Sequence, residues 1–277
     1  MEQAMGIEGK FRRIESAQNE RFKAVIRLMG SNSTMRATGL AAAEGLHLAE
    51  YLLEGTDQEI ESIWAPDSLS NNQEWLALLH SSGLLQQGDF PLWVLPDNLY
   101  SRISRLGTPT GPLIFFKPPT PVEALNLQQD VVLLDGIQDP GNVGTILRNC
   151  AAAGIGQVAF SEHCAWVWSE KVLRAGMGAQ FGLRLYSEKN LLQAMSELRV
   201  RMPVRVTSLH PSSVDLFDLD LTPAGVWVFG SEGQGVSKCW LERATTHIRI
   251  PQTSLVESMN VGSSSAVCLF EQLRQRR

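Results

Sequence analysis

Polar residues that can do chemistry stand at three points in the second half of the chain. Asn142 and Arg148 lie in VVLLDGIQDPGNVGTILRNCAAA at 131–153, Glu232 lies in FGSEGQG at 229–235, and Ser258 and Asn260 lie in IPQTSLVESMNVGSSSAV at 250–267. An asparagine amide donates and accepts hydrogen bonds, whereas a guanidinium remains charged and binds anionic oxygen. These residue types predict a site that orients a polar substrate and stabilises negative charge on it.

Each of the three segments reads as a hydrophobic strand, then a Gly- or Asn-bearing loop, then a helix. After residue 122 the predicted strands are 131–134, 157–160, 183–186, 204–209, 225–229 and 248–250, and the predicted helices are 143–153, 169–175, 191–198 and 261–275. This alternation predicts an α/β fold with a mostly parallel sheet and helices on both faces. Open sheets of this kind bind ligands at the carboxyl ends of their strands, which is where the three loops would meet.

The three motifs together resemble those of the SpoU, or TrmH-like, family of RNA ribose 2′-O-methyltransferases. The resemblance rests on Asn142 with Arg148, on Gly230-Ser231-Glu232-Gly233-Gln234-Gly235, and on Ile250-Pro251 followed by Glu257-Ser258-Met259-Asn260-Val261. It covers roughly the last 150 residues, which is the size of one compact domain. Two departures are Gly262 early in the last helix and Gly176, where relatives commonly have serine.

The resemblance implies a protein that uses S-adenosyl-L-methionine to methylate a ribose 2′-OH in RNA. It assigns catalytic roles to Arg148, Asn142, Glu232, Ser258 and Asn260, and cofactor binding to Gly230, Ile250 and Met259. It also implies a carboxyl-terminal trefoil knot and a homodimer, and it requires no metal. Composition and periodicity by themselves predict only a doubly wound sheet, because chains rarely thread loops.

Each of these residues also has a structural interpretation. Gly230 lets the main chain approach a planar ring, or it is a turn glycine. Ser258 and Asn260 precede a helix and can cap it. We expect Glu232 to lock the cleft, for example by accepting from Asn142. For Arg148 we prefer phosphate binding and stabilisation of the 2′ oxygen over a role as general base, because a guanidinium rarely gives up its proton. A surface salt bridge is the alternative.

A Gly- and Pro-rich stretch at 107–122 predicts a domain boundary. We expect a small α/β domain at 1–117, a linker at 118–122 and the methyltransferase domain at 123–277. Within the first, helices are predicted at 20–29 and 40–53 and strands at 62–65, 91–94 and 113–116. This part resembles the ribosomal-protein-like RNA-binding domain of many family members. The candidate RNA contacts are Arg12, Arg13, Arg21, Lys23, Arg27 and Arg36, with Lys171, Arg174 and the tail Arg274, Arg276 and Arg277. Solvated helix charges explain most such runs equally well.

The composition excludes several classes of protein. With 277 residues, of which 44% are hydrophobic and 19% charged, the chain can bury a sizeable core. A net charge of −5 argues against a protein that coats nucleic acid with general positive charge. The four cysteines form no C-x-x-C pair, no leader or membrane span is evident, and the five histidines lack metal-ligand spacing. A cytoplasmic protein with reduced thiols is expected.

Two other functions stay open. A dinucleotide-binding oxidoreductase is suggested by Gly136, Gly141 and Gly144 after a strand, with Glu162 further on. Its fingerprint has one residue between the first two glycines, whereas this loop has four. The second alternative is a non-catalytic RNA-binding protein on the same scaffold. Among methyltransferase substrates we favour ribosomal over transfer RNA, because such an amino-terminal domain is frequent among the family's ribosomal RNA members.

Overall fold

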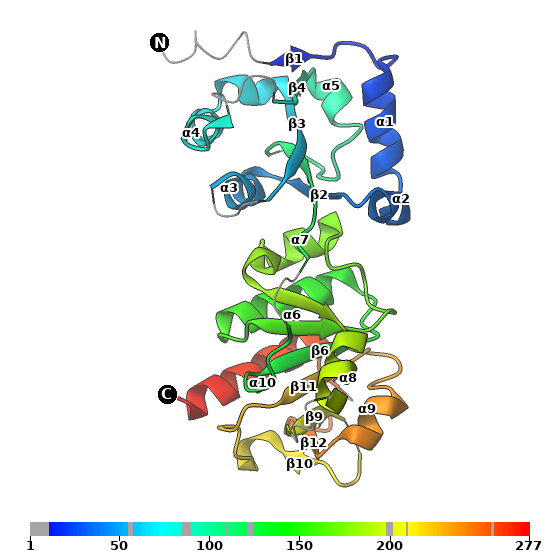
Figure 1. Cartoon of the computed structure of the whole chain (residues 1–277), viewed down its shortest axis with the longest axis vertical. Helices are drawn as coiled ribbons and strands as arrows, with labels where there is room; N and C mark the ends of the chain where they lie inside the picture. Colours follow the sequence, from blue (N-terminus) through cyan, green and yellow to red (C-terminus); the bar gives the residue numbers. More distant parts are fainter. Residues whose placement is uncertain are drawn as a thin grey trace. The chain divides into compact units, whose positions relative to one another are not determined.

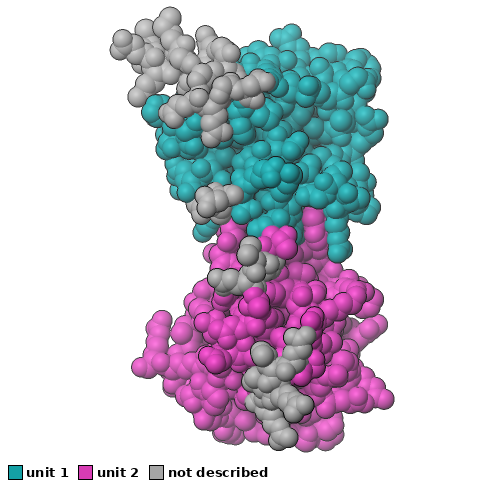
Figure 2. Space-filling model, in the orientation of Figure 1, with its two compact units in different colours: residues 1–119, 168–170 teal, residues 120–167, 171–277 magenta. Residues whose placement is uncertain are grey.

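The computed structural model describes residues 11–54, 58–84, 90–108, 110–120, 124–197, 202–208, 210–255 and 258–277. The chain divides into two compact units, the first comprising 1–119 with 168–170 and the second 120–167 with 171–277 (Figure 2). The division between residues 119 and 120 falls in the predicted linker, whose residues 121 and 122 lie outside the described ones.

The first unit has a five-stranded sheet in the order β1-β4-β3-β5-β2. Strand β5 pairs antiparallel with β2 and β3, while β4 pairs parallel with β1 and β3. The elements are β1 (Arg12–Arg13), α1 (Glu20–Met29), α2 (Asn32–Ala37), β2 (Ala41–Glu44), α3 (Leu46–Glu54), β3 (Ile60–Pro66), η1 (Asp67–Asn71), α4 (Gln73–Ser81), β4 (Leu92–Leu95), α5 (Asp97–Tyr100) and β5 (Leu113–Phe116).

One sequence prediction in this unit is wrong. The helix expected over 40–53 is a strand, β2, followed by the helix α3. Three alanines favour helix by propensity, but Ala41, Ala42 and Ala43 are buried in β2, which pairs with β5. Gly45, with φ at +112°, separates the strand from the helix. Tertiary burial therefore overrides the local preference.

The second unit has a seven-stranded sheet in the order β10-β12-β9-β11-β6-β7-β8, and each of its strand pairs is parallel. The predicted α/β fold with a mostly parallel sheet is confirmed. The elements are β6 (Val131–Asp135), α6 (Pro140–Ala152), β7 (Gln157–Phe160), α7 (Glu170–Gly176), η3 (Ala179–Gly182), β8 (Arg184–Ser187), α8 (Glu188–Glu197), β9 (Val204–Thr207), β10 (Val214–Asp215), η4 (Leu216–Asp218), β11 (Val226–Gly230), α9 (Lys238–Arg243), β12 (Thr246–Arg249) and α10 (Val261–Gln275).

Alternate residues of the central strands bury opposite faces of this sheet. On one face Val131, Leu133, Val226 and Val228 share a core with Trp240 of α9, and Leu191 of α8 belongs to the same core. On the other face α10 packs against α6, and its Gln272 accepts a hydrogen bond from the indole of Trp227 on β11 at 2.7 Å. Helices therefore cover both faces (Figure 1).

Strand register brings the first two motifs together. Strands β6 and β11 pair so that Asp135 stands opposite Gly230, and both residues end their strands. The backbone NH of Ser237, at the far end of the second motif loop, donates to the Asp135 carboxylate at 2.7 Å. The second motif loop therefore both begins and ends beside Asp135, where the first motif loop begins.

Among the described residues, no helix is long and apolar enough to cross a membrane, and no group of three His, Cys, Asp or Glu side chains can hold a metal ion. All four cysteines are free. Burial raises the pKa of the Cys150 and Cys268 thiols, which lie on α6 and α10.

Candidate functional site

Three polar side chains, one from each motif, form a hydrogen-bonded cluster. The Asn142 amide donates to Glu232 Oε1 at 2.9 Å, and the Asn260 amide donates to the same oxygen at 2.9 Å and to Asn142 Oδ1 at 2.8 Å. The predicted acceptance by Glu232 from Asn142 is confirmed. Segments separated by 90 and 118 residues are thereby fixed to one another.

The helices that carry these side chains begin where the sequence provides caps. Asp139 Oδ1 accepts from the backbone NH of Asn142 at 2.8 Å, and Pro140 occupies the first turn of α6. Asn260 Oδ1 accepts from the backbone NH of Ser263 at 3.2 Å. Asn260 is therefore both the predicted cap of α10 and a member of the cluster.

Gly230 is needed by the second motif loop itself. The loop folds back so that Ser231 and Gly235 exchange backbone hydrogen bonds of 3.1 and 2.9 Å. A Cβ on Gly230 would lie 2.3 Å from the carbonyl carbon of Gly235 and 2.4 Å from its oxygen. The structure therefore gives Gly230 the role of a turn glycine, and the approach of a planar ring to it stays a prediction.

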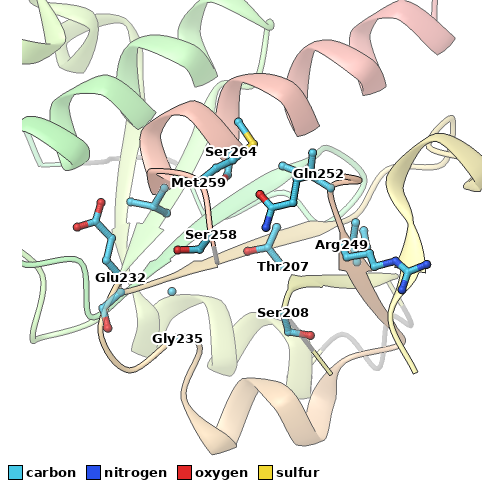
Figure 3. A pocket seen from close by; sticks show the side chains of 14 residues that line it. Thr207, Ser208, Glu232, Gly235, Arg249, Gln252, Ser258, Met259 and Ser264 are labelled. Carbon is cyan, nitrogen blue, oxygen red and sulfur yellow. The ribbon is translucent and has the colours of Figure 1, made fainter. Parts of the chain in front are cut away.

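A pocket of about 210 Å³ lies between the second and third motifs (Figure 3). The three residues predicted to bind a cofactor, Gly230, Ile250 and Met259, line it, as do Glu232 and Ser258. Its lining also includes the apolar residues Ile248 and Val261 and several hydroxyl-bearing residues. In Figure 3 Glu232 and Arg249 stand at opposite ends of the pocket, with Ser258 and Thr207 between them. The structure thus brings residues from two distant motifs to one cavity.

Arg148 does not line this pocket. It is exposed on α6, six residues after Asn142, which is a rotation of about 120° away from that side chain around the helix. Among the residues that the structure describes, Arg148 makes no hydrogen bond or ion pair. The expected return of its side chain to the cleft is therefore not observed, and neither is the alternative salt bridge.

Asn149 is a residue that the sequence analysis missed. Seven residues after Asn142, it lies within about 20° of the same helix face, and its amide donates to Gly262 O and Ser265 Oγ on α10, both at 2.9 Å. A Cβ on Gly262 would lie 2.9 Å from Cγ2 of Thr145. The glycine that departs from the family pattern therefore permits the close approach of α10 to α6.

The second departure also has a packing reason. A Cβ on Gly176 would lie 2.7 Å from Oε1 of the buried Gln180. Gly144 of α6 is equally constrained, because its Cβ would lie 2.5 Å from Cβ of Ala175 on α7. Helices α6 and α7 thus meet at glycines, so the Gly144 of the supposed dinucleotide fingerprint serves helix packing.

A second, larger pocket of about 760 Å³ opens on the other side of the 231–235 loop. The residues that it shares with the first pocket are Ser231, Glu232 and Gly235. Its remaining lining comes from the end of β6 and the loop that follows, from Asn142 on α6, from His163 and from the segment up to Lys238. Glu232 therefore stands on the wall between two cavities.

The predicted RNA contacts have different surroundings. Arg12 and Arg21 lie over the ring of Trp93, with guanidinium carbons 5.2 and 4.9 Å from its centre. Carboxylates hold others, because Arg13 pairs with Asp67, Lys23 with Glu20, Arg274 with Glu271, and Arg276 with Asp130. Arg27, Arg36, Lys171, Arg174 and Arg277 are exposed.

A parallel α/β sheet with two adjoining pockets and a polar cluster at the carboxyl ends of its strands defines a ligand-binding α/β protein with the layout of an enzyme. The chain belongs to the SpoU rRNA Methylase family, whose model matches residues 129–270. The predicted family is confirmed.

The relatives support the same placement. The chain is 34% identical over 147 residues to a 23S rRNA (guanosine-2′-O-)-methyltransferase RlmB of Bordetella pertussis, an alignment that covers 53% of this chain and 60% of the relative. It is 26% identical over 260 residues to the 23S rRNA (guanosine(2553)-2′-O)-methyltransferase RlmP of Bacillus subtilis, covering 94% and 98%. The alignments to several of the most similar curated relatives span 57 to 60% of their length.

A solved structure of a putative RNA methyltransferase of the TrmH family from Porphyromonas gingivalis superposes with a TM-score of 0.75 at 28% identity. It covers 94% of this chain and 100% of the other. The match therefore extends beyond the residues that the family model covers.

Proposed function

We propose that the protein methylates a ribose 2′-OH of RNA, with ribosomal RNA as the substrate and S-adenosyl-L-methionine as the methyl donor. The observation that carries the proposal is the cluster of Asn142, Glu232 and Asn260, because it joins the three family motifs beside a pocket lined by the predicted cofactor residues. The names of the RlmB and RlmP relatives support ribosomal RNA over transfer RNA.

The first pocket suits the methyl donor chemically. Ile250 and Met259 offer apolar surface to an adenine ring, while hydroxyl groups such as Thr207 and Ser231 can bond its ribose and amino acid part. When bound, S-adenosyl-L-methionine supplies the methyl group: its carbon–sulfur bond breaks as the carbon–oxygen bond to the 2′ oxygen forms, leaving S-adenosylhomocysteine.

The remaining residues act on the acceptor. Glu232 holds two amide donors in fixed positions, so the cluster presents oriented polar atoms without rearrangement. The hydroxyl of Ser258, at the pocket, can accept a hydrogen bond from the 2′-OH, and the proton that the 2′ oxygen loses goes to solvent water. Arg148 is exposed and makes no bond within the described part of the chain, so its guanidinium is available to bind the acceptor's phosphate and to stabilise the 2′ oxygen.

The knot and the homodimer belong to the same proposal. Strand β12 lies beyond β9 in the sheet, whereas α10, which follows it, packs against α6 and β11. This return of α10 to the centre of the sheet supports a carboxyl-terminal trefoil knot, which the family resemblance implies. In a homodimer the exposed Arg148 of one subunit can serve its partner's site.

We assign RNA binding to the first unit, the predicted domain 1–117, on the strength of the arginines stacked on Trp93. In the same proposal, residues 123–277 are the methyltransferase domain and residues 118–122 are the linker. A ribosomal RNA substrate makes the cytoplasm the expected compartment. The family membership favours this function over an oxidoreductase, and the intact cluster favours it over a non-catalytic RNA-binding protein.

Transfer of a labelled methyl group to RNA tests the proposal. Ribosomal RNA from cells lacking the protein should accept label at one mapped 2′ position, transfer RNA should not, and calorimetry should detect S-adenosyl-L-methionine but not NAD. Arg148→Ala should abolish transfer without changing cofactor affinity, whereas Arg148→Lys should keep a little activity. Equal and complete inactivity of both would contradict charge stabilisation, and no labelling by the unaltered protein would overturn the function itself.

A further inference from the structure

The second pocket is not explained by cofactor binding. It shares the Ser231 to Gly235 wall with the first pocket. Its other residues come from the first motif segment between Asp135 and Asn142, from His163 and from the segment that ends at Lys238. A methyl group moves directly from donor to acceptor, so the acceptor must occupy a space that adjoins the donor. The second pocket meets that requirement, because Glu232 borders both cavities.

We infer that the second pocket holds the acceptor nucleotide of the RNA and that Lys238, His163 and Gln138 determine its affinity and base specificity. This inference rests on the proposed methyltransferase function. A volume of about 760 Å³ lies in the range of ligand pockets, roughly 300–1,000 Å³. In this arrangement the ribose lies next to Glu232, and Lys238 binds a backbone phosphate. His163 and Gln138 contact the base.

Lys238 is suited to the phosphate. Its side chain is 88% exposed, and its ion pair with Glu242 is loose at 3.6 Å. It is the single lysine or arginine among the residues described as lining this pocket, where Asp135 and Asp139 already accept backbone NH groups of the protein. An anion entering the pocket therefore meets one cation, Lys238, while Asp135 and Asp139 keep their negative charge but each direct one oxygen to a backbone NH group.

His163 and Gln138 stand on loops that are tied together. The backbone NH of Ala165 donates to Ile137 O at 2.8 Å, and the NH of Gly136 donates to Ser161 Oγ at 2.9 Å. These bonds hold the loop after β7 against the loop after β6. The backbone that carries the exposed side chains of His163 and Gln138 is therefore held in place. An imidazole and a carboxamide can each donate and accept, as the edge of a base requires.

The test compares the full-length protein with Lys238→Ala, Lys238→Arg, and the double variant His163→Ala with Gln138→Ala, on a short single-stranded RNA that carries the mapped methylation site. Lys189→Ala, which removes an exposed lysine of the same unit that lies in neither pocket, is the matched control. We expect Lys238→Ala to raise KM for the RNA about tenfold, with unchanged cofactor affinity and thermal stability. Lys238→Arg should restore most of the affinity.

Two further readouts separate a contact from a structural effect. Loss of one phosphate contact should lower the slope of log KM against log salt concentration by about 0.7 for Lys238→Ala. The double variant should lose discrimination when the target base is changed, a loss that Lys189→Ala should not show. Unchanged KM, salt slope and base discrimination in variants that still bind cofactor and transfer methyl groups would overturn the acceptor site and leave the proposed function standing. A protein that transfers no methyl group at all would instead remove that function.

Discussion

The two units hold their functional candidates in different ways. In the second unit the polar side chains of three distant segments hydrogen-bond one another, with Glu232 accepting from Asn142 and Asn260. In the first unit the exposed Arg21 and the half-buried Arg12 rest on the ring of Trp93. A hydrogen-bonded network holds its atoms in fixed positions, which bond-making requires. Guanidinium groups stacked on a ring keep their charge toward solvent, and this charge attracts phosphate over a distance.

The largest expected effect comes from Gly230→Ala. Its methyl group would lie 2.3 Å from backbone atoms of Gly235, which are not the flexible end of a side chain. The 231–235 loop must shift, lowering the free energy of unfolding by about 1–3 kcal/mol. We expect cofactor binding to vanish in calorimetry and methyl transfer to become undetectable.

Gly233→Ala, in the same loop, is the matched control because a Cβ there has nothing within 4 Å. It should bind the cofactor as the unaltered protein does. Normal cofactor binding by Gly230→Ala would show that this loop is pliable and that the motif segments of the second unit are not held rigidly.

The next effect tests the cluster itself. Glu232→Ala leaves two amide groups without their shared acceptor, so kcat should fall about a hundredfold, the scale of losing one preorganised group from an active site. Because the three side chains act as a unit, the double variant Glu232→Ala with Asn142→Ala should lose little more than either single variant. Rate losses that multiply would mean that the two residues act independently. Single-turnover kinetics at saturating cofactor gives the values.

A smaller effect is expected in the first unit. Arg21→Ala removes one exposed cation over Trp93, so the RNA dissociation constant should rise severalfold and the slope of log affinity against log salt should fall by about 0.7 to 0.9. The cofactor affinity should be unaffected. Lys117→Ala removes a cation that is already held by Glu59 and should change neither quantity. Equal salt slopes for Arg21→Ala and the unaltered protein would remove the RNA-binding role of this surface.

The sequence predicts the elements that are long, apolar and fully buried. Strand 157–160 and helix 261–275 have the expected bounds, and the cluster of motif residues follows from the rule that parallel strands end at one edge. The short β1 and β10, of two residues each, lack the length to form a pattern. The helix expected at 40–53 fails because the burial of three alanines decides their conformation.

Side-chain direction around a helix is harder to predict than membership of a motif. Asn149 shares the face of Asn142, a relation that counting seven residues along the helix would have found, whereas Arg148 points elsewhere. Interactions such as that of Arg205 on β9 with Gln272 on α10 depend on which strands become neighbours. Burial lowers the pKa of that arginine, and no local spacing in the sequence signals it.

The smallest effect concerns a local ion pair, which serves as the counterpart of the long-range cluster. Glu271 accepts from Arg274 and Gln275 on the same helix at 2.8 to 2.9 Å, and these hydrogen bonds lower its pKa to about 2. A carboxyl group whose folded pKa lies below the unfolded value of about 4.3 stabilises the protein above that pH, and this stabilisation is lost as the pH falls toward 2. Glu271→Gln should therefore be less stable than the unaltered protein at pH 6, with the difference shrinking between pH 4.3 and 2 in urea unfolding.

The control for this pair is Glu242→Gln, because the Glu242 carboxylate meets Lys238 only at 3.6 Å on the surface. It should change stability less than Glu271→Gln at pH 6. Neither variant should alter the kcat of methyl transfer, since both carboxylates lie outside the cluster and the two pockets. A loss of kcat in Glu271→Gln would mean that the end of α10 controls the position of Asn260 at its start, and the cluster would then depend on the whole helix rather than on its own three hydrogen bonds.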